Sequence, residues 1–78
     1  MNPKKLQLLK SAAQLALLGL DVDAARETLR QLAARGAGYD SEEMLRAYER
    51  FTELDRQWRD LEQKHLALRE EIRQKTSK

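Results

Sequence analysis

Apolar residues in the second half of the chain recur every three or four positions. The series consists of Phe51, Leu54, Trp58, Leu61, His65, Leu68 and Ile72. This spacing places the side chains along one side of an α-helix, and His65 is the single polar member of the series. The positions between them are mostly charged, which is typical of the solvent-facing side of an amphipathic helix. The pattern therefore predicts one long helix with a continuous apolar seam.

A similar series occupies the first half of the chain. Its members are Leu8, Ser11, Leu15, Leu18, Val22, Ala25, Leu29, Leu32 and Gly36. The series keeps its phase past Gly19 and Asp21, where a break between two helices would normally reset it. We therefore favour one helix over residues 3–35, bent at Gly19. The alternative is a break at Gly19–Asp21, with Asp21 capping a further helix and three helices in the chain.

Local signals mark the ends of these helices. Asn2 is a favourable N-cap, and Pro3 fits the first turn of a helix, where its missing N–H is harmless. Gly36 and Gly38 permit the positive φ values that commonly end a helix. The turn is therefore predicted to lie around these two glycines.

The second helix is predicted to start at a capping box formed by Asp40 and Glu43, with Tyr39 and Met44 packed together as a hydrophobic staple. The expected boundaries are a helix over residues 3–35, a turn over 36–40, a helix over 41–74 and a frayed tail over 75–78.

Folding the two series together about Gly38 predicts an all-α antiparallel hairpin in a single domain. The layers of this hairpin pair Leu32 with Met44, Leu29 with Ala47, Ala25 with Phe51, Val22 with Leu54, Leu18 with Trp58, Leu15 with Leu61 and Leu8 with Leu68. The register sets alanine opposite phenylalanine, which fills space without strain. It also places Ser11 opposite His65, which we interpret as a polar layer that fixes the register.

Composition narrows the possible chemistry. Of the 78 residues 36% are charged, but the net charge is only +2, so a strongly phosphate-binding surface is not indicated. The chain has no cysteine and one histidine, so we expect no disulfide, no metal and no other cofactor. The lack of cysteine fits a cytoplasmic protein. The longest nearly apolar run, residues 12–20, is interrupted by Gln14 and is too short to span a membrane.

Four arginines near the predicted turn form a candidate anion-binding group. They are Arg26, Arg30, Arg46 and Arg50. Such a group would suit a small dimeric helical RNA- or DNA-binding protein, although acidic residues share the region. Nucleic-acid binding is therefore kept as one alternative function.

Several motifs follow one another between Ala25 and Trp58. They are an Ala-Arg-x-x-Leu-x-x-Leu-Ala helix, a glycine turn, a Ser-Glu-Glu-x-Leu-Arg helix start and an aromatic ending. This arrangement resembles the sporulation-regulatory aspartyl-phosphate phosphatases. Those are short cytoplasmic helical hairpins that bind a phosphorylated response regulator and hydrolyse its aspartyl phosphate. The resemblance implies the hairpin fold and, with a three-residue shift of the family's acidic signature, places Glu53 or Asp55 in the acid role.

The first helix carries more apolar residues than one neighbouring helix can cover. The additional residues are Leu6, Leu9, Ala13, Leu17 and Leu20, with Leu66 of the second helix near the same level. The outer face of the second helix near the turn is, in contrast, expected to be charged. An exposed apolar patch usually marks an interface, and a chain this short has little core of its own. We therefore predict a homodimer, assembled as a four-helix bundle, or an obligate complex with another protein.

The favoured hypothesis is thus a small non-enzymatic protein-binding or regulatory module that acts through coiled-coil-like packing. The two alternatives are a divergent aspartyl-phosphate phosphatase and the nucleic-acid-binding protein described above.

Overall fold

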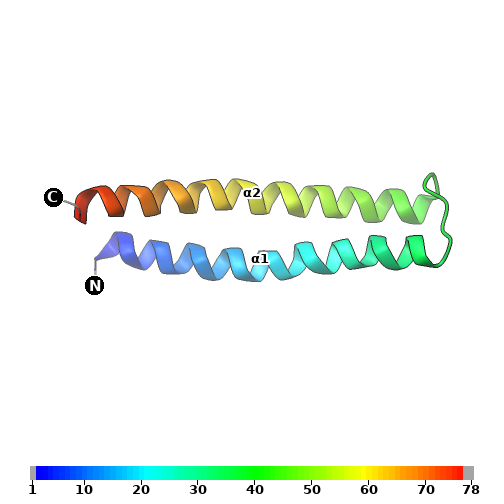
Figure 1. Cartoon of the computed structure of the whole chain (residues 1–78), viewed down its shortest axis with the longest axis horizontal. Helices are drawn as coiled ribbons and strands as arrows, with labels where there is room; N and C mark the ends of the chain where they lie inside the picture. Colours follow the sequence, from blue (N-terminus) through cyan, green and yellow to red (C-terminus); the bar gives the residue numbers. More distant parts are fainter. Residues whose placement is uncertain (1, 77–78) are drawn as a thin grey trace.

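Two long helices and a short turn make up the computed structural model, which describes residues 2–76. Helix α1 spans Pro3–Ala34 and helix α2 spans Glu42–Thr76. They lie side by side and antiparallel in a rod of 57 × 17 × 14 Å, with the start of α1 and the end of α2 opposite the turn (Figure 1). No strand occurs in residues 2–76. The predicted all-α helical hairpin is therefore confirmed.

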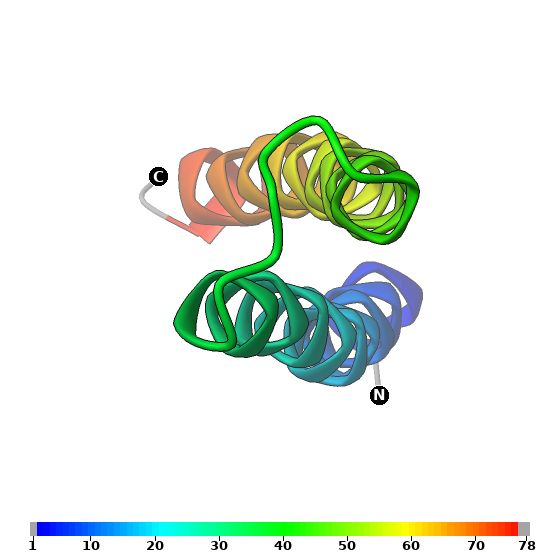
Figure 2. The same cartoon turned by 90° about the vertical axis from the view of Figure 1, so that its right-hand side faces the viewer.

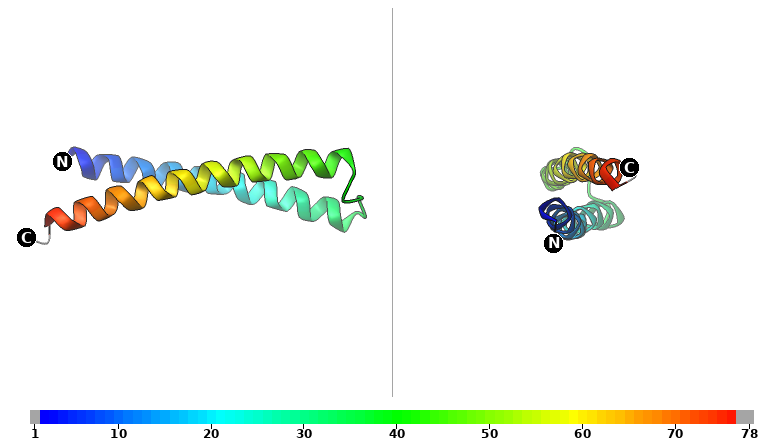
Figure 3. Two further views of the ribbon diagram at one scale, coloured as in Figure 1. Left: turned by 90° about the horizontal axis from the view of Figure 1, so that it is seen from above. Right: turned by 90° about the vertical axis from the view of Figure 1, so that its left-hand side faces the viewer.

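The two helices cross at an angle. Figure 3, which includes a view of the hairpin from above, shows the crossing near the middle of the rod. In the end-on view of Figure 2, α2 lies on one side of α1 only. The opposite side of α1 therefore has no neighbour within the part of the chain that the structure describes.

Helix α1 is continuous through Gly19, so the alternative with a break at Gly19–Asp21 and three helices is not formed. Glycine fits here because Trp58 of α2 packs against this position. A Cβ on residue 19 would lie 3.3 Å from Trp58 Nε1. The Trp58 indole N–H donates a hydrogen bond to the Leu15 carbonyl at 3.1 Å. In a helix, residue 19 lies beside the carbonyl of residue 15. The missing side chain of Gly19 therefore leaves room for the Trp58 indole to reach the Leu15 carbonyl.

A glycine also ends α1. Gly36 has a φ of 80°, a value that costs most other residues a steric penalty. The N–H groups of Gly36 and Ala37 donate to the carbonyls of Ala33 and Leu32, both at 3.0 Å. These two bonds form a Schellman motif, so the predicted glycine stop is correct.

Ser41 caps the start of α2 in place of Asp40. The Ser41 hydroxyl accepts a hydrogen bond from the Met44 N–H at 3.2 Å. The predicted capping box of Asp40 and Glu43 is therefore wrong by one residue, because serine caps a helix as well as aspartate does. The Asp40 carboxylate instead lies over Gly38, 3.1 Å from the position that a Cβ there would take.

The predicted seam residues are buried or half-buried, except Gly36 at the end of the first series, which is exposed in the turn. The most buried are Val22, Ala25, Leu32 and Met44, each 4–7% exposed. The half-buried ones are Leu8, Ser11, Leu15, Leu18, Leu29, Ala47, Phe51, Leu54, Trp58, Leu61, His65, Leu68 and Ile72. The four best-covered side chains all lie in the half of the hairpin next to the turn, so the core is densest there and thins toward the open end.

Polar contacts close the open end of the hairpin. The Asn2 side chain accepts a hydrogen bond from the Lys4 N–H at 2.9 Å and so caps α1 as predicted. The Lys4 ammonium forms an ion pair with the Glu71 carboxylate of α2. Lys75, one turn further on, lies 3.8 Å from the same carboxylate. This small network ties the first turn of α1 to the last turns of α2.

The helix boundaries differ from the predicted ones by one or two residues. Helix α1 ends at Ala34, and α2 continues through Lys75 and Thr76, which the sequence analysis assigned to the tail. Lysine favours the helix intrinsically, and its contact with Glu71 supports the last turn. The rest of the predicted tail, residues 77–78, lies outside the described residues.

A double-mutant cycle tests the contact between Gly19 and Trp58. Gly19→Ala alone should change the stability little, because a gain of about 1 kcal/mol in helix propensity is offset by crowding of the indole. In a Trp58→Phe background the indole N–H is gone, and the same alanine should then stabilise the chain by about 1 kcal/mol. Urea unfolding of the four chains at one protein concentration measures both values. Equal effects of alanine in the two backgrounds would show that the contact does not constrain residue 19.

The Lys4–Glu71 ion pair predicts that part of the stability of the hairpin depends on pH. The hydrogen bond and charge of Lys4 lower the pKa of Glu71. The contribution of the pair is therefore present above the ordinary glutamate pKa of about 4.3 and is lost as the pH falls through the lowered value. We expect Glu71→Gln to lower the urea midpoint at pH 7 more than Glu70→Gln does, with the difference shrinking in acid. A difference that is independent of pH would contradict this account.

Candidate functional site

The most prominent exposed apolar feature lies on the first half of α1. We call it the leucine face, and it consists of Leu6, Leu9, Ala13, Ala16, Leu17 and Leu20. The four leucines are 45%, 56%, 66% and 65% exposed in chain order. Both alanines are exposed as well. Five of these six residues are among those that the sequence analysis assigned to an interface, and the structure leaves all of them uncovered.

The leucine face points away from α2. At about 100° per residue, its side chains lie roughly half a turn around α1 from seam residues such as Leu15 and Val22. Helix α2 covers the seam and cannot reach the opposite side, which Figure 2 shows open. One turn beyond Leu20 the same side of α1 continues with Ala24 and then with polar residues such as Gln31. The apolar surface is therefore confined to about 22 Å of helix.

Leu66 does not join the leucine face. It is 49% exposed and lines a separate depression on α2 together with Leu8 and Ile72. Leu8 is a seam residue, so this depression lies beside the contact between the two helices and not behind α1. The sequence placed Leu66 at the correct level along the rod, but the angular position around α2 separates it from the other interface residues.

A second apolar surface, at the turn end, was missed by the sequence analysis. Tyr39, Leu45 and Tyr48 are 83%, 50% and 56% exposed. They line a concave surface whose floor includes Leu29 and Met44. The outer face of α2 near the turn was expected to be charged, and this part of it is apolar instead. The three-residue step from Leu45 to Tyr48, beside the seam, was the available signal.

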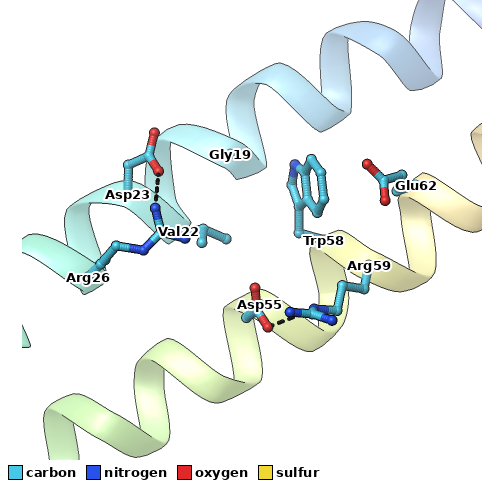
Figure 4. Close-up of a pocket in the computed structure, with 8 residues that line it drawn as sticks. All are labelled: Gly19, Val22, Asp23, Arg26, Asp55, Trp58, Arg59 and Glu62. Carbon is cyan, nitrogen blue, oxygen red and sulfur yellow. Dashed lines mark hydrogen bonds and ion pairs between the residues drawn. The ribbon is translucent and has the colours of Figure 1, made fainter.

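A groove beside Trp58 is lined by side chains from both helices (Figure 4). The lining residues are Gly19, Val22, Asp23, Arg26, Asp55, Trp58, Arg59 and Glu62. Its charges are mostly paired within the groove. Arg26 contacts the Asp23 carboxylate at 3.3 Å, and Arg59 contacts Asp55 at 2.9 Å. The groove is therefore close to electrically balanced and offers little free charge to a ligand.

The two carboxylates implied by the family resemblance are both engaged with cations on α2. Glu53 accepts hydrogen bonds from Arg56 at 2.6 Å and from Gln57 at 3.1 Å. These contacts, above all the one with Arg56, lower the pKa of Glu53, which favours its charged form. Asp55 is paired with Arg59. Both carboxylates are therefore occupied by arginines of their own helix.

The four arginines of the candidate anion-binding group are largely neutralised by acids on their own helices. Arg30 pairs with Glu27 at 3.0 Å, and Arg46 pairs with Glu42 at 2.5 Å. Arg26, besides its contact in the groove, lies over the Phe51 ring with 5.7 Å between the guanidinium carbon and the ring centroid. Within residues 2–76, Arg50 is the one member of the group that forms no ion pair. The turn half therefore lacks the concentrated positive charge that phosphate binding needs.

Ser11 and His65 meet across the hairpin as the register predicted, with 2.6 Å between Ser11 Oγ and His65 Nδ1. The Ser11 hydroxyl also donates to the Leu8 carbonyl at 3.0 Å. A hydroxyl has one proton to donate, so both contacts are satisfied when His65 carries its proton on Nδ1 and donates it to Ser11. A serine whose proton goes to the backbone is not activated by the histidine as a nucleophile. The pair acts as a polar layer of the seam.

Comparisons of the chain with protein-family models, with curated proteins and with solved structures found no match. Within residues 2–76 there is no group of three or more His, Cys, Asp or Glu side chains that could hold a metal ion. Neither α1 nor α2, over their described lengths, contains a segment that is long and apolar enough to cross a membrane. The feature that most distinguishes the described surface is the leucine face.

Proposed function

We propose that this chain is a small non-enzymatic protein-binding module, regulatory in character, that associates with another apolar helical surface through the leucine face. The observation that carries the proposal is the exposure of four leucines, between 45% and 66%, on the side of α1 that α2 does not cover. Contiguous exposed leucines of this kind are uncommon on a protein that functions alone.

The energetics of a short chain support the same proposal. Among the described residues, only four hydrophobic side chains are less than 9% exposed, and each of them keeps 4–7% of its surface accessible. Fully burying a leucine contributes about 1.5–3 kcal/mol, so covering the exposed half of each of four leucines would contribute about 1 kcal/mol per side chain. A domain below about 80 residues usually needs such additional stabilisation. Association through the leucine face would supply it, in the simplest case by joining two hairpins into a four-helix assembly.

Two charges placed in the leucine face test the proposal. The Leu9→Glu/Leu17→Glu chain should lose association by at least about 100-fold, because each carboxylate would have to be buried without a partner. Sedimentation measures self-association, and capture on the immobilised chain measures binding to other proteins.

The matched control is Ala24→Glu/Gln31→Glu, which adds the same two charges to the same side of α1, beyond the apolar segment. Both residues are exposed, and association should be retained. If the two double variants behave alike, the leucine face is not the binding surface.

The second candidate function is the phosphatase activity that the family resemblance implies. The observation that favours it is the position of Asp55 at the wall of the Trp58 groove, where its side chain is 26% exposed (Figure 4). The ion pair with Arg59 argues against the phosphatase activity, because the arginine occupies the Asp55 carboxylate.

A direct assay separates the two proposals. We expect the unmodified chain to leave the rate of dephosphorylation of an aspartyl-phosphorylated response regulator unchanged, and Asp55→Ala to have no effect. An acceleration that Asp55→Ala abolishes, and that Asp60→Ala leaves intact, would establish the phosphatase and reject the non-enzymatic module.

A further inference from the structure

We propose that the leucine face binds a second copy of this chain, with the two α1 helices antiparallel and back to back about a two-fold axis beside Ala13. The inference rests on the proposed function, because it names the occupant of the same surface. It is supported by the order of large and small residues in the leucine face and by the charges at its two ends.

Apart from Ala16, whose counterpart on reversal is Lys10, the leucine face reads the same in both directions about Ala13. Two leucines lie at each end, Leu6 with Leu9 and Leu17 with Leu20, and small residues occupy the centre around Ala13. When the helix is turned end over end about Ala13, Leu6 meets Leu20 of the second copy, Leu9 meets Leu17, and Ala13 meets its own counterpart. The alanines allow the two helices to approach closely at the centre while the leucines fill the ends. A two-fold interface requires this kind of self-complementary surface.

The two ends of the leucine face carry opposite charge. Lys5 and Lys10 flank the start, and Asp21 and Asp23 flank the finish. Antiparallel pairing places Lys5 of each copy beside Asp23 of the other, on the same flank of the helix pair. Parallel pairing would instead bring lysines beside lysines and aspartates beside aspartates, which is unfavourable. The charges therefore select the antiparallel arrangement.

These charged side chains are available for such contacts. Lys5, Lys10 and Asp21 form no ion pair within residues 2–76. Asp23 contacts Arg26 at 3.3 Å, yet its side chain remains 69% exposed. A neighbouring helix can therefore reach all four without breaking a buried interaction.

The pairing gives a row of four helices in place of the four-helix bundle expected from the sequence. The leucine face lies opposite the seam, so the two α1 helices form the middle of the row and each α2 lies outside its own α1, as the end-on view of a single hairpin indicates (Figure 2). The two turns then point to opposite ends of the assembly. Each end carries one apolar surface of Tyr39, Leu45 and Tyr48, which the pairing leaves uncovered.

Single cysteines at the two ends of the leucine face test the arrangement, because the chain has no cysteine of its own. Mixing the Leu6→Cys chain with the Leu20→Cys chain under mild oxidation should give a disulfide-linked dimer. Each chain alone should give at least about tenfold less linked dimer. Antiparallel pairing about Ala13 holds the same residue of the two copies about 21 Å apart, beyond the reach of a disulfide.

Other cross-linking patterns would overturn the proposal in distinguishable ways. Efficient linkage of Leu6→Cys to itself would show a parallel pair. A chain that sediments as a monomer and gives no linkage would reject the second copy as the occupant. The proposed binding function would still stand in that case if Leu9→Glu/Leu17→Glu abolished capture of another protein and the Ala24→Glu/Gln31→Glu control did not.

Charge exchange provides an independent measurement. Lys5→Asp and Asp23→Lys should each weaken self-association, by about two- to fivefold per contact. An equimolar mixture of the two chains should restore the unmodified affinity, because every aspartate at position 5 then faces a lysine at position 23. A mixture that associates no better than either variant alone would reject the antiparallel register.

Discussion

Two helices can cover only one side of each other, and this constraint governs the whole molecule. The seam of α1 is covered by α2, whereas the leucine face on the far side of α1 is left to solvent. A third or fourth helix in the same chain would have covered it. Within residues 2–76 no other element covers it, and this exposure is the observation on which the proposed function rests. Beyond the apolar surface at the turn end, the outer side of α2 is polar and carries ion pairs such as Arg56–Glu53, so it needs no such cover.

The seam itself depends on a few contacts that no generic leucine packing would supply. Gly19 lets the Trp58 indole reach the Leu15 carbonyl, and the Ser11–His65 layer joins the two helices by a side-chain hydrogen bond. A hairpin held by leucines alone can slide by one helical turn at little cost. These directional contacts make such a slide unfavourable, since each polar group would lose its partner. They therefore fix the register that positions the leucine face.

The fold was largely predictable from the sequence because it depends on the spacing of residues along the chain. The three-four spacing gave the two seams, Gly36 gave the stop of α1, and pairing about the turn brought Ser11 to His65. The remaining features depend on angles around a helix axis or on turn geometry. Which of Asp40 and Ser41 caps α2 was decided by the path of the turn. The separation of Leu66 from the leucine face required the angular position of α2.

The candidate site was predictable in its residues but not in its shape. The excess of leucines on the first helix was visible in the sequence, and the helical step of about 100° places them opposite the seam, which favours a row over a bundle. The folded chain showed that α2 covers the seam alone and leaves the opposite side open. The apolar surface of Tyr39, Leu45 and Tyr48 was missed because charged neighbours dominate the same stretch of sequence. The single three-residue step from Leu45 to Tyr48 is too short to stand out as a period of its own.

The uneven density of the core has a consequence for the order of folding. The four best-buried side chains lie next to the turn, where the Schellman motif and the Ser41 cap also hold the two helix ends. Contacts near a turn join residues close in sequence and so form with the smallest loss of chain entropy. We therefore expect the contacts between the two helices to form first at the turn and then progressively toward the open end. The segment that bears the leucine face is then the last to order, so in the proposed complex its ordering would coincide with binding.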